Sequence, residues 1–131
     1  MVKITRSNNL LYWLPVLLWM ALIFALSARP AVQATTVDWA DFFLKKTAHF
    51  IEYFILNFWL LLALKKTQRL SRTRLFFTAF FISVIYAATD EFHQTFIPGR
   101  EGRVRDVLID TLGVSASMWY FSRPGFGWYM L

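Results

Sequence analysis

The sequence predicts an all-α polytopic membrane protein with four transmembrane helices and both termini in the cytoplasm, and three observations lead to this fold class. Of the 131 residues, 57% are hydrophobic and 19% aromatic, more than a water-soluble core of this size needs. The apolar residues form four runs of about 20 residues, the length that crosses the hydrocarbon core of a bilayer. Charged residues gather between these runs and at their ends. We therefore treat residues 1–131 as a single integral membrane domain.

The first two predicted spans differ in where their polar residues lie. The first covers residues 10–28, a run without any charged residue. Lys3 and Arg6 precede it, so a cleaved signal peptide is the alternative, but the run is longer than the apolar core of a typical signal peptide. The second span covers residues 46–64, with polar side chains in its first two turns and apolar ones after them. The side chains of this span that could bind a ligand or react therefore lie at one end.

The third and fourth predicted spans, 75–92 and 104–121, also carry their acidic residues at one end. Asp90 and Glu91 close the third span, whereas Asp106 and Asp110 lie in the first half of the fourth. Consecutive spans cross the membrane in opposite directions. The polar end of the second span and the acidic ends of the third and fourth therefore meet on one side of the membrane.

The orientation follows from the linker KKTQRLSRTR between the second and third spans. This linker contains five basic residues and no acid, and basic loops stay in the cytoplasm. The linker and both termini are thus predicted to be cytoplasmic, and all eight acidic residues fall in outer loops or in the outer halves of helices. We expect an integral protein of the inner or plasma membrane with a functional pocket on the extracytoplasmic side.

Composition also limits the chemistry. The chain has no cysteine, so a disulfide, a thiolate metal site and a thiol nucleophile are all excluded. Its net charge of +6 comes without a glycine-rich phosphate loop or a nucleic-acid-binding motif, so no nucleic-acid partner is predicted. The lipid bilayer is the one partner that the sequence requires. Cofactor, metal dependence and oligomeric state stay open at this point.

Helical spacing brings the polar residues of the three helix ends together into one predicted pocket. Lys46, His49 and Tyr53 share a face of the second span, with Glu52 beside them. A charge in lipid costs at least ~2.5 kcal/mol, so such residues normally line a cavity or contact a partner. The candidate ligand-binding residues are Lys46, His49, Glu52, Tyr53, Gln94, Arg100, Arg103 and Asp110, and the candidate catalytic residues are His49, Asp90, Glu91 and Asp106.

The order of these residues resembles the VanZ-like membrane protein family, of the teicoplanin-resistance type. The similarity covers roughly residues 46–117. Its motifs are Lys-x-x-His-x-x-x-Tyr at Lys46, His49 and Tyr53; Asp-Glu-x-x-Gln at Asp90, Glu91 and Gln94; Pro-Gly-Arg at Pro98, Gly99 and Arg100; and Asp-x-x-x-Asp-x-x-Gly at Asp106, Asp110 and Gly113. The family often has Asn at the place of Asp110. The resemblance implies a small polytopic protein of the cell envelope, associated with resistance to a lipoglycopeptide, and no particular catalytic mechanism.

Three function classes remain for the outer pocket. A binding protein would take an amphiphilic anionic ligand of the cell envelope, lipid-linked or a lipoglycopeptide, with lysine and arginine on its anionic head. An intramembrane hydrolase would use acid–base or metal-assisted chemistry on a lipid headgroup. A transporter would couple the same groups to protons or ions. The sequence favours binding, because it contains neither a two-histidine metal motif nor a recognisable serine nucleophile.

A purely structural role is the alternative for each charged group. His49 could pair with Glu52 on its own helix or with Asp90 or Asp106 on another, and so hold the helices together. The carboxylates of Asp90 and Glu91 could hold the outer loop closed by pairing with Arg100, Arg103 or Arg105.

Overall fold

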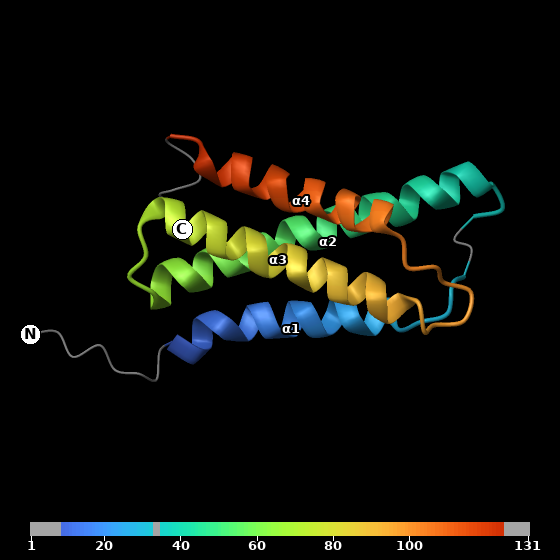
Figure 1. Cartoon of the computed structure of the whole chain (residues 1–131), viewed down its shortest axis with the longest axis horizontal. Coiled ribbons are helices and arrows are strands. Elements are labelled where there is room, and N and C mark those ends of the chain that lie inside the picture. Colours follow the sequence, from blue (N-terminus) through green and yellow to red (C-terminus); the bar gives the residue numbers. More distant parts are fainter. Residues whose placement is uncertain (1–8, 33–34, 125–131) are drawn as a thin grey trace, which may run out of the picture.

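A computed structural model describes residues 9–32 and 35–124, and within these ranges the chain forms α-helices and no strand. The helices are α1 (Asn9–Ser27), α2 (Asp38–Thr67), α3 (Arg72–Gln94) and α4 (Val104–Ser122). They form an up-and-down bundle in which α1 and α3 run in one direction and α2 and α4 in the other (Figure 1). The predicted all-α fold is confirmed.

Three of these helices, α1, α2 and α3, are long and apolar enough to cross a membrane. The prediction of four spans is therefore met by three helices. The fourth helix, α4, is long enough with 19 residues but is not apolar enough. The reason lies in the first half of α4, where Arg105, Asp106 and Asp110 reduce the mean hydropathy below that of a typical span.

The second helix is longer than predicted, because it begins at Asp38 rather than at residue 46. Asp38 and Asp41 lie in its first turn and Lys65 and Lys66 in its last turn. Carboxylates stabilise the N-terminal end of a helix dipole and cations stabilise its C-terminal end. The polar turns on both sides of the apolar run therefore belong to the helix, and its first turns extend beyond the other helix ends (Figure 1).

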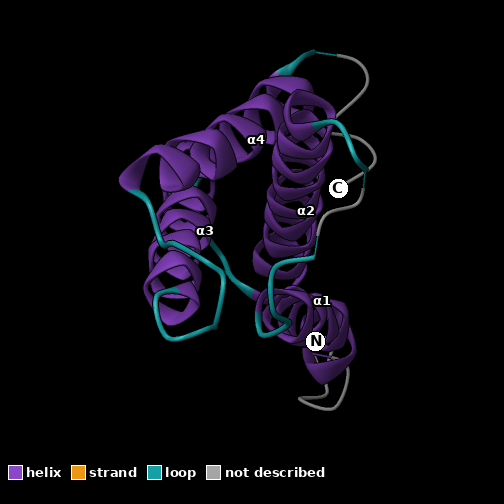
Figure 2. Ribbon diagram, turned by 90° about the vertical axis from the view of Figure 1, so that its right-hand side faces the viewer, coloured by secondary structure: helices purple, strands orange, loops and turns teal. Residues whose placement is uncertain are grey.

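The central helix of the bundle is α2, which packs against all three other helices, whereas α1 and α4 do not touch within the described ranges. Figure 2 shows α1 and α4 on opposite sides of α2. The apolar core lies along α2, where Tyr53, Leu56 and Leu60 are fully buried. Large apolar side chains on the outer faces of the helices are exposed, among them Leu18, Phe81 and Leu112, as expected for surfaces that face lipid.

A glycine sets the register between α2 and α4. A Cβ atom added at Gly113 would lie 2.2 Å from the carbonyl oxygen of Phe50, so only glycine fits there. Small residues at helix contacts let two backbones approach closely within a membrane. Since α2 and α4 run in parallel, this contact fixes which residues of the two helices face each other one and two turns away.

The α3–α4 connection turns sharply at Pro98 and Gly99. The Arg100 N–H donates to the Ile97 carbonyl at 3.1 Å, and Gly99 has a φ of 76°. A type II β-turn requires a positive φ at its third position, which glycine supplies here, and proline is common at its second position. The connection lies beside the end of α1 and the start of α2, whereas the basic α2–α3 linker lies at the opposite end of the bundle (Figure 1).

Candidate functional site

A cavity of about 1080 Å³ lies at the end of the bundle that is opposite the basic linker. Its wall comes from the end of α1, the start of α2 and the α3–α4 connection, and it contains charges of both signs beside apolar side chains. The cationic lining residues are Arg29, Lys45, Lys46, Arg100, Arg103 and Arg105; the acidic ones are Asp38, Asp41, Glu52, Glu101 and Asp106; and the apolar ones include Leu26, Pro30, Val32 and Phe42.

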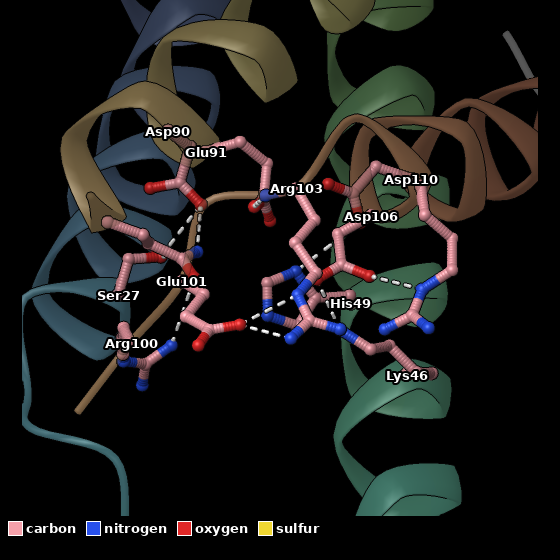
Figure 3. Close-up of polar contacts among 12 residues, drawn as sticks. Ser27, Lys46, His49, Asp90, Glu91, Arg100, Glu101, Arg103, Asp106 and Asp110 are labelled. Carbon is pink, nitrogen blue, oxygen red and sulfur yellow. Dashed lines mark hydrogen bonds and ion pairs between the residues drawn. The ribbon is translucent and has the colours of Figure 1, made fainter.

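Two contacts between polar side chains join α2 to α4 at this end. Lys46 Nζ lies 2.7 Å from Asp106 Oδ2, and His49 Nδ1 lies 3.3 Å from Asp110 Oδ1 (Figure 3). The two contacts are three residues apart on α2 and four residues apart on α4, about one helical turn on each, as expected for helices that pack in parallel at Gly113. Asp110 is fully buried, and neither of its oxygens has a partner with hydrogen-bond geometry among the described residues. The charges of α4 therefore point to α2 and away from lipid.

Asp90 joins α3 to the end of α1. Its Oδ2 accepts hydrogen bonds from Ser27 Oγ at 2.8 Å and from Gln94 Nε2 at 3.1 Å. All three residues are buried. Ser27 could not be selected from the sequence, because a serine at the end of an apolar run looks like an ordinary helix end. Its function as a donor to Asp90 follows from tertiary structure.

Arg100 closes the C-terminal end of α1. Its guanidinium donates to the carbonyl oxygen of Arg29 at 2.7 Å and to that of Leu26 at 3.2 Å. These carbonyls belong to the last turn of α1 and the residues just after it, where a helix leaves acceptors without an internal partner. A third, longer hydrogen bond of 3.4 Å connects Arg100 to Gln94 Oε1. The alternative that Arg100 pairs with Asp90 or Glu91 is therefore wrong.

Glu91 is held by the main chain of the loop and not by an arginine side chain. Its Oε2 accepts from the Arg103 N–H at 3.1 Å, while the Arg103 guanidinium pairs with Glu101, whose carboxylate raises the Arg103 pKa. Gly102 makes this approach possible, since a Cβ atom there would lie 2.2 Å from the Glu91 carbonyl oxygen. The other oxygen of Glu91, Oε1, is buried without a hydrogen bond in the described part of the chain.

The predicted residues separate into those that line the cavity and those that lie behind it. His49 connects the two groups, because it lines the cavity and contacts Asp110 behind it. This contact corrects the predicted pairing of His49 with Glu52, Asp90 or Asp106. His49, Glu91 and Asp110 offer ligand atoms that all lie within 4.8 Å of one another, so together they could hold a metal ion. Lys46, His49, Glu52, Gln94, Arg100, Arg103 and Asp106 line the cavity, whereas Tyr53, Asp90, Glu91 and Asp110 lie behind it.

These features define an all-helical protein with three helices able to cross a membrane and a charged cavity at one end of the bundle. The chain belongs to the VanZ/LLP1 family, which matches it over residues 12–124, so the predicted VanZ-like family is confirmed. This match includes α2, α3 and α4 in full and most of α1. No curated protein and no solved structure matches the chain.

Proposed function

We propose that the protein binds an amphiphilic, anionic ligand of the cell envelope in this cavity. The observation that carries the proposal is a pair of arginines without carboxylate partners beside an apolar wall. Arg29 is exposed and its guanidinium has no hydrogen bond or ion pair within the described ranges, and Arg100 bonds only to amide and carbonyl oxygens. Both line the cavity together with Leu26 and Val32.

The chemistry of this wall fits a head group with a hydrocarbon chain. A guanidinium presents a planar fork of donors that matches the oxygens of a phosphate or a carboxylate. The other cations of the cavity have carboxylate neighbours: Lys45 lies 2.6 Å from Asp41, and Lys46 pairs with Asp106. Arg29 and Arg100 are therefore the groups available to an anion, while the apolar residues beside them and the surrounding bilayer accept the chain.

We further propose that α4 is a fourth membrane-embedded helix and that the cavity faces outward. Asp106 and Asp110 are directed at α2, whereas Leu108, Leu112 and Trp119 are each about 60% exposed on the outer face of α4. A helix whose charges are paired internally can lie in lipid despite its low mean hydropathy. If all four helices cross the membrane, the positive-inside rule puts the basic α2–α3 linker in the cytoplasm, and both termini lie on the same side as this linker.

Membership of the VanZ/LLP1 family supports an amphiphilic ligand of this kind. A lipoglycopeptide antibiotic and a lipid-linked envelope precursor both combine a polar head with a hydrocarbon chain. Either would place its acyl chain in the membrane and its head at the level of the cavity. We therefore place the protein in the cell membrane, with its cavity at the envelope side, and connect it with glycopeptide resistance through this binding.

Native mass spectrometry of the detergent-purified protein tests the binding. We expect phosphatidylglycerol to be retained in preference to phosphatidylcholine of the same acyl chains. Arg29→Ala should lose this preference, and Arg69→Ala, which removes an exposed arginine at the opposite end, should keep it. Arg29 is the better test than Arg100, because Arg100 also closes α1. Equal retention of both lipids by the parent protein would overturn the proposal.

A further inference from the structure

Three side chains with metal-ligand chemistry converge from three helices behind the cavity (Figure 3). His49 of α2, Glu91 of α3 and Asp110 of α4 have ligand atoms within 4.8 Å of one another. Ligands of a tetrahedral zinc ion lie ~3.4 Å apart at bond lengths of about 2.1 Å. His49 Nδ1 and Asp110 Oδ1 are already separated by 3.3 Å. Small rotations of the two carboxylates are therefore sufficient to place all three ligands around one ion.

The two carboxylates of this cluster are buried with oxygens that lack partners in the described part of the chain. Asp110 is 0% exposed and neither of its oxygens accepts a hydrogen bond; Glu91 is 3% exposed and only its Oε2 does. Burial of a carboxylate is costly unless donors, an opposite charge or a metal compensate it. A neutral imidazole and two carboxylates carry two negative charges, which one divalent cation cancels.

We propose that His49, Glu91 and Asp110 form a binding site for one divalent metal ion, with zinc as the best match. One imidazole and two carboxylates, without a thiolate, are ligands that zinc accepts, whereas calcium and magnesium prefer oxygen alone. Three protein ligands leave a coordination position free, which is the arrangement of reactive rather than structural zinc sites. The Arg103 N–H donates a hydrogen bond to the Glu91 carboxylate and so orients this carboxylate as a metal ligand.

The free position of the ion opens toward the cavity. His49 is the one member of the cluster that lines the cavity, with 14% of its side chain exposed. The same cavity contains Arg29 and Arg100, so the ion and the two guanidinium groups would meet the same anionic head group. This last step rests on the proposed function, whereas metal binding by the three side chains does not.

Calorimetric titration of the full-length protein tests the site. The protein is purified in detergent, stripped with a chelator, freed of the chelator and titrated with Zn²⁺. We expect one ion per chain and a higher melting temperature of the zinc-bound protein. Glu91→Gln and Asp110→Asn should each weaken zinc binding by at least ~10-fold. Glu101→Gln is the matched control, because it makes the same chemical change on an exposed carboxylate.

Two outcomes would overturn the site: no zinc uptake by the parent protein, or uptake by Glu91→Gln and Asp110→Asn equal to that of the control. If those variants fail to fold, the parent alone decides the question. Bound Co²⁺ should then give the visible absorption of a tetrahedral nitrogen and oxygen site, and its absence counts against the proposal. Arg29→Ala separates the two proposals, since it should lose the lipid preference and bind zinc like the parent.

Discussion

Replacing Gly113 by alanine should separate α2 from α4 at the level of the site. The added Cβ atom would lie 2.2 Å from the Phe50 carbonyl oxygen, and ordinary contact begins at 3.4 Å, so the helices must part or slide by about 1.2 Å. The obstructing atom belongs to the main chain, so no rotation of a side chain relieves the clash. The Lys46–Asp106 and His49–Asp110 contacts cross the same interface and must adjust with it.

Two opposing effects determine the loss of stability. Forcing extra volume into a close contact costs about 1–3 kcal/mol. Alanine has a higher helix propensity than glycine, which returns about 1 kcal/mol inside a helix. We expect the unfolding free energy to fall by up to about 2 kcal/mol. The site should also be affected, because His49 and Asp110, now 3.3 Å apart, lie on the two helices that must part, and the shift takes this pair away from the spacing of ~3.4 Å between zinc ligands.

The assay compares the parent, Gly113→Ala and Ser115→Ala in detergent by thermal melting and zinc titration. Ser115 is a suitable control, because its exposed hydroxyl bonds only to Thr111 of the same helix. Gly113→Ala should lower the melting temperature and weaken zinc binding at least ~10-fold, a change of about 1.4 kcal/mol. The control should match the parent. An unchanged melting temperature and zinc affinity in Gly113→Ala would refute the reasoning that this glycine sets the register of the site.

Three further predictions concern topology, charge and the end of α1. In the cysteine-free chain, Glu101→Cys should react with an impermeant maleimide on intact cells. A cysteine in the basic linker should react only after lysis. The reverse pattern would show that the topology is inverted. Asp106→Asn should lower the unfolding free energy by about 1–3 kcal/mol. It should also strengthen the retention of phosphatidylglycerol, because the Lys46 ammonium loses its carboxylate partner. Weaker retention would instead assign Asp106 a direct role in binding. Ser27→Ala should lower the unfolding free energy by about 1–2 kcal/mol in a denaturant series, because buried Asp90 loses a donor; an unchanged value would show that Gln94 satisfies Asp90 alone.

Much of the fold could be predicted because it depends on local pattern. Apolar runs of spanning length located four helices, and their observed bounds differ from the predicted spans chiefly at the polar ends. The start of α2 was missed, since Asp38 and Asp41 look like loop residues until they are placed in the first turn of a helix. For α4, length and pattern located the helix, but its hydropathy does not identify it as a span.

The site was predictable as a group of residues and not as a set of contacts. Helical spacing places Lys46 and His49 on one face, but their partners depend on the register between α2 and α4. That register is set by the contact between Gly113 and the Phe50 carbonyl, which is 63 residues away along the chain, and no local pattern reveals it. The same limit applies to Ser27, whose partner Asp90 is 63 positions away.

These long separations have a consequence for biosynthesis. Ribosomes deliver the chain from its N-terminus, so α1 and α2 reach the membrane before α3, the following loop and α4 exist. Until then the end of α1 lacks Arg100, and Lys46 and His49 of α2 lack Asp106 and Asp110. A nascent chain that stops before α4 therefore exposes uncompensated charge at the bilayer surface, where membrane proteases and insertases would encounter it. The cavity, whose lining includes Arg105 and Asp106 of α4, is therefore completed only when the last helix has been made.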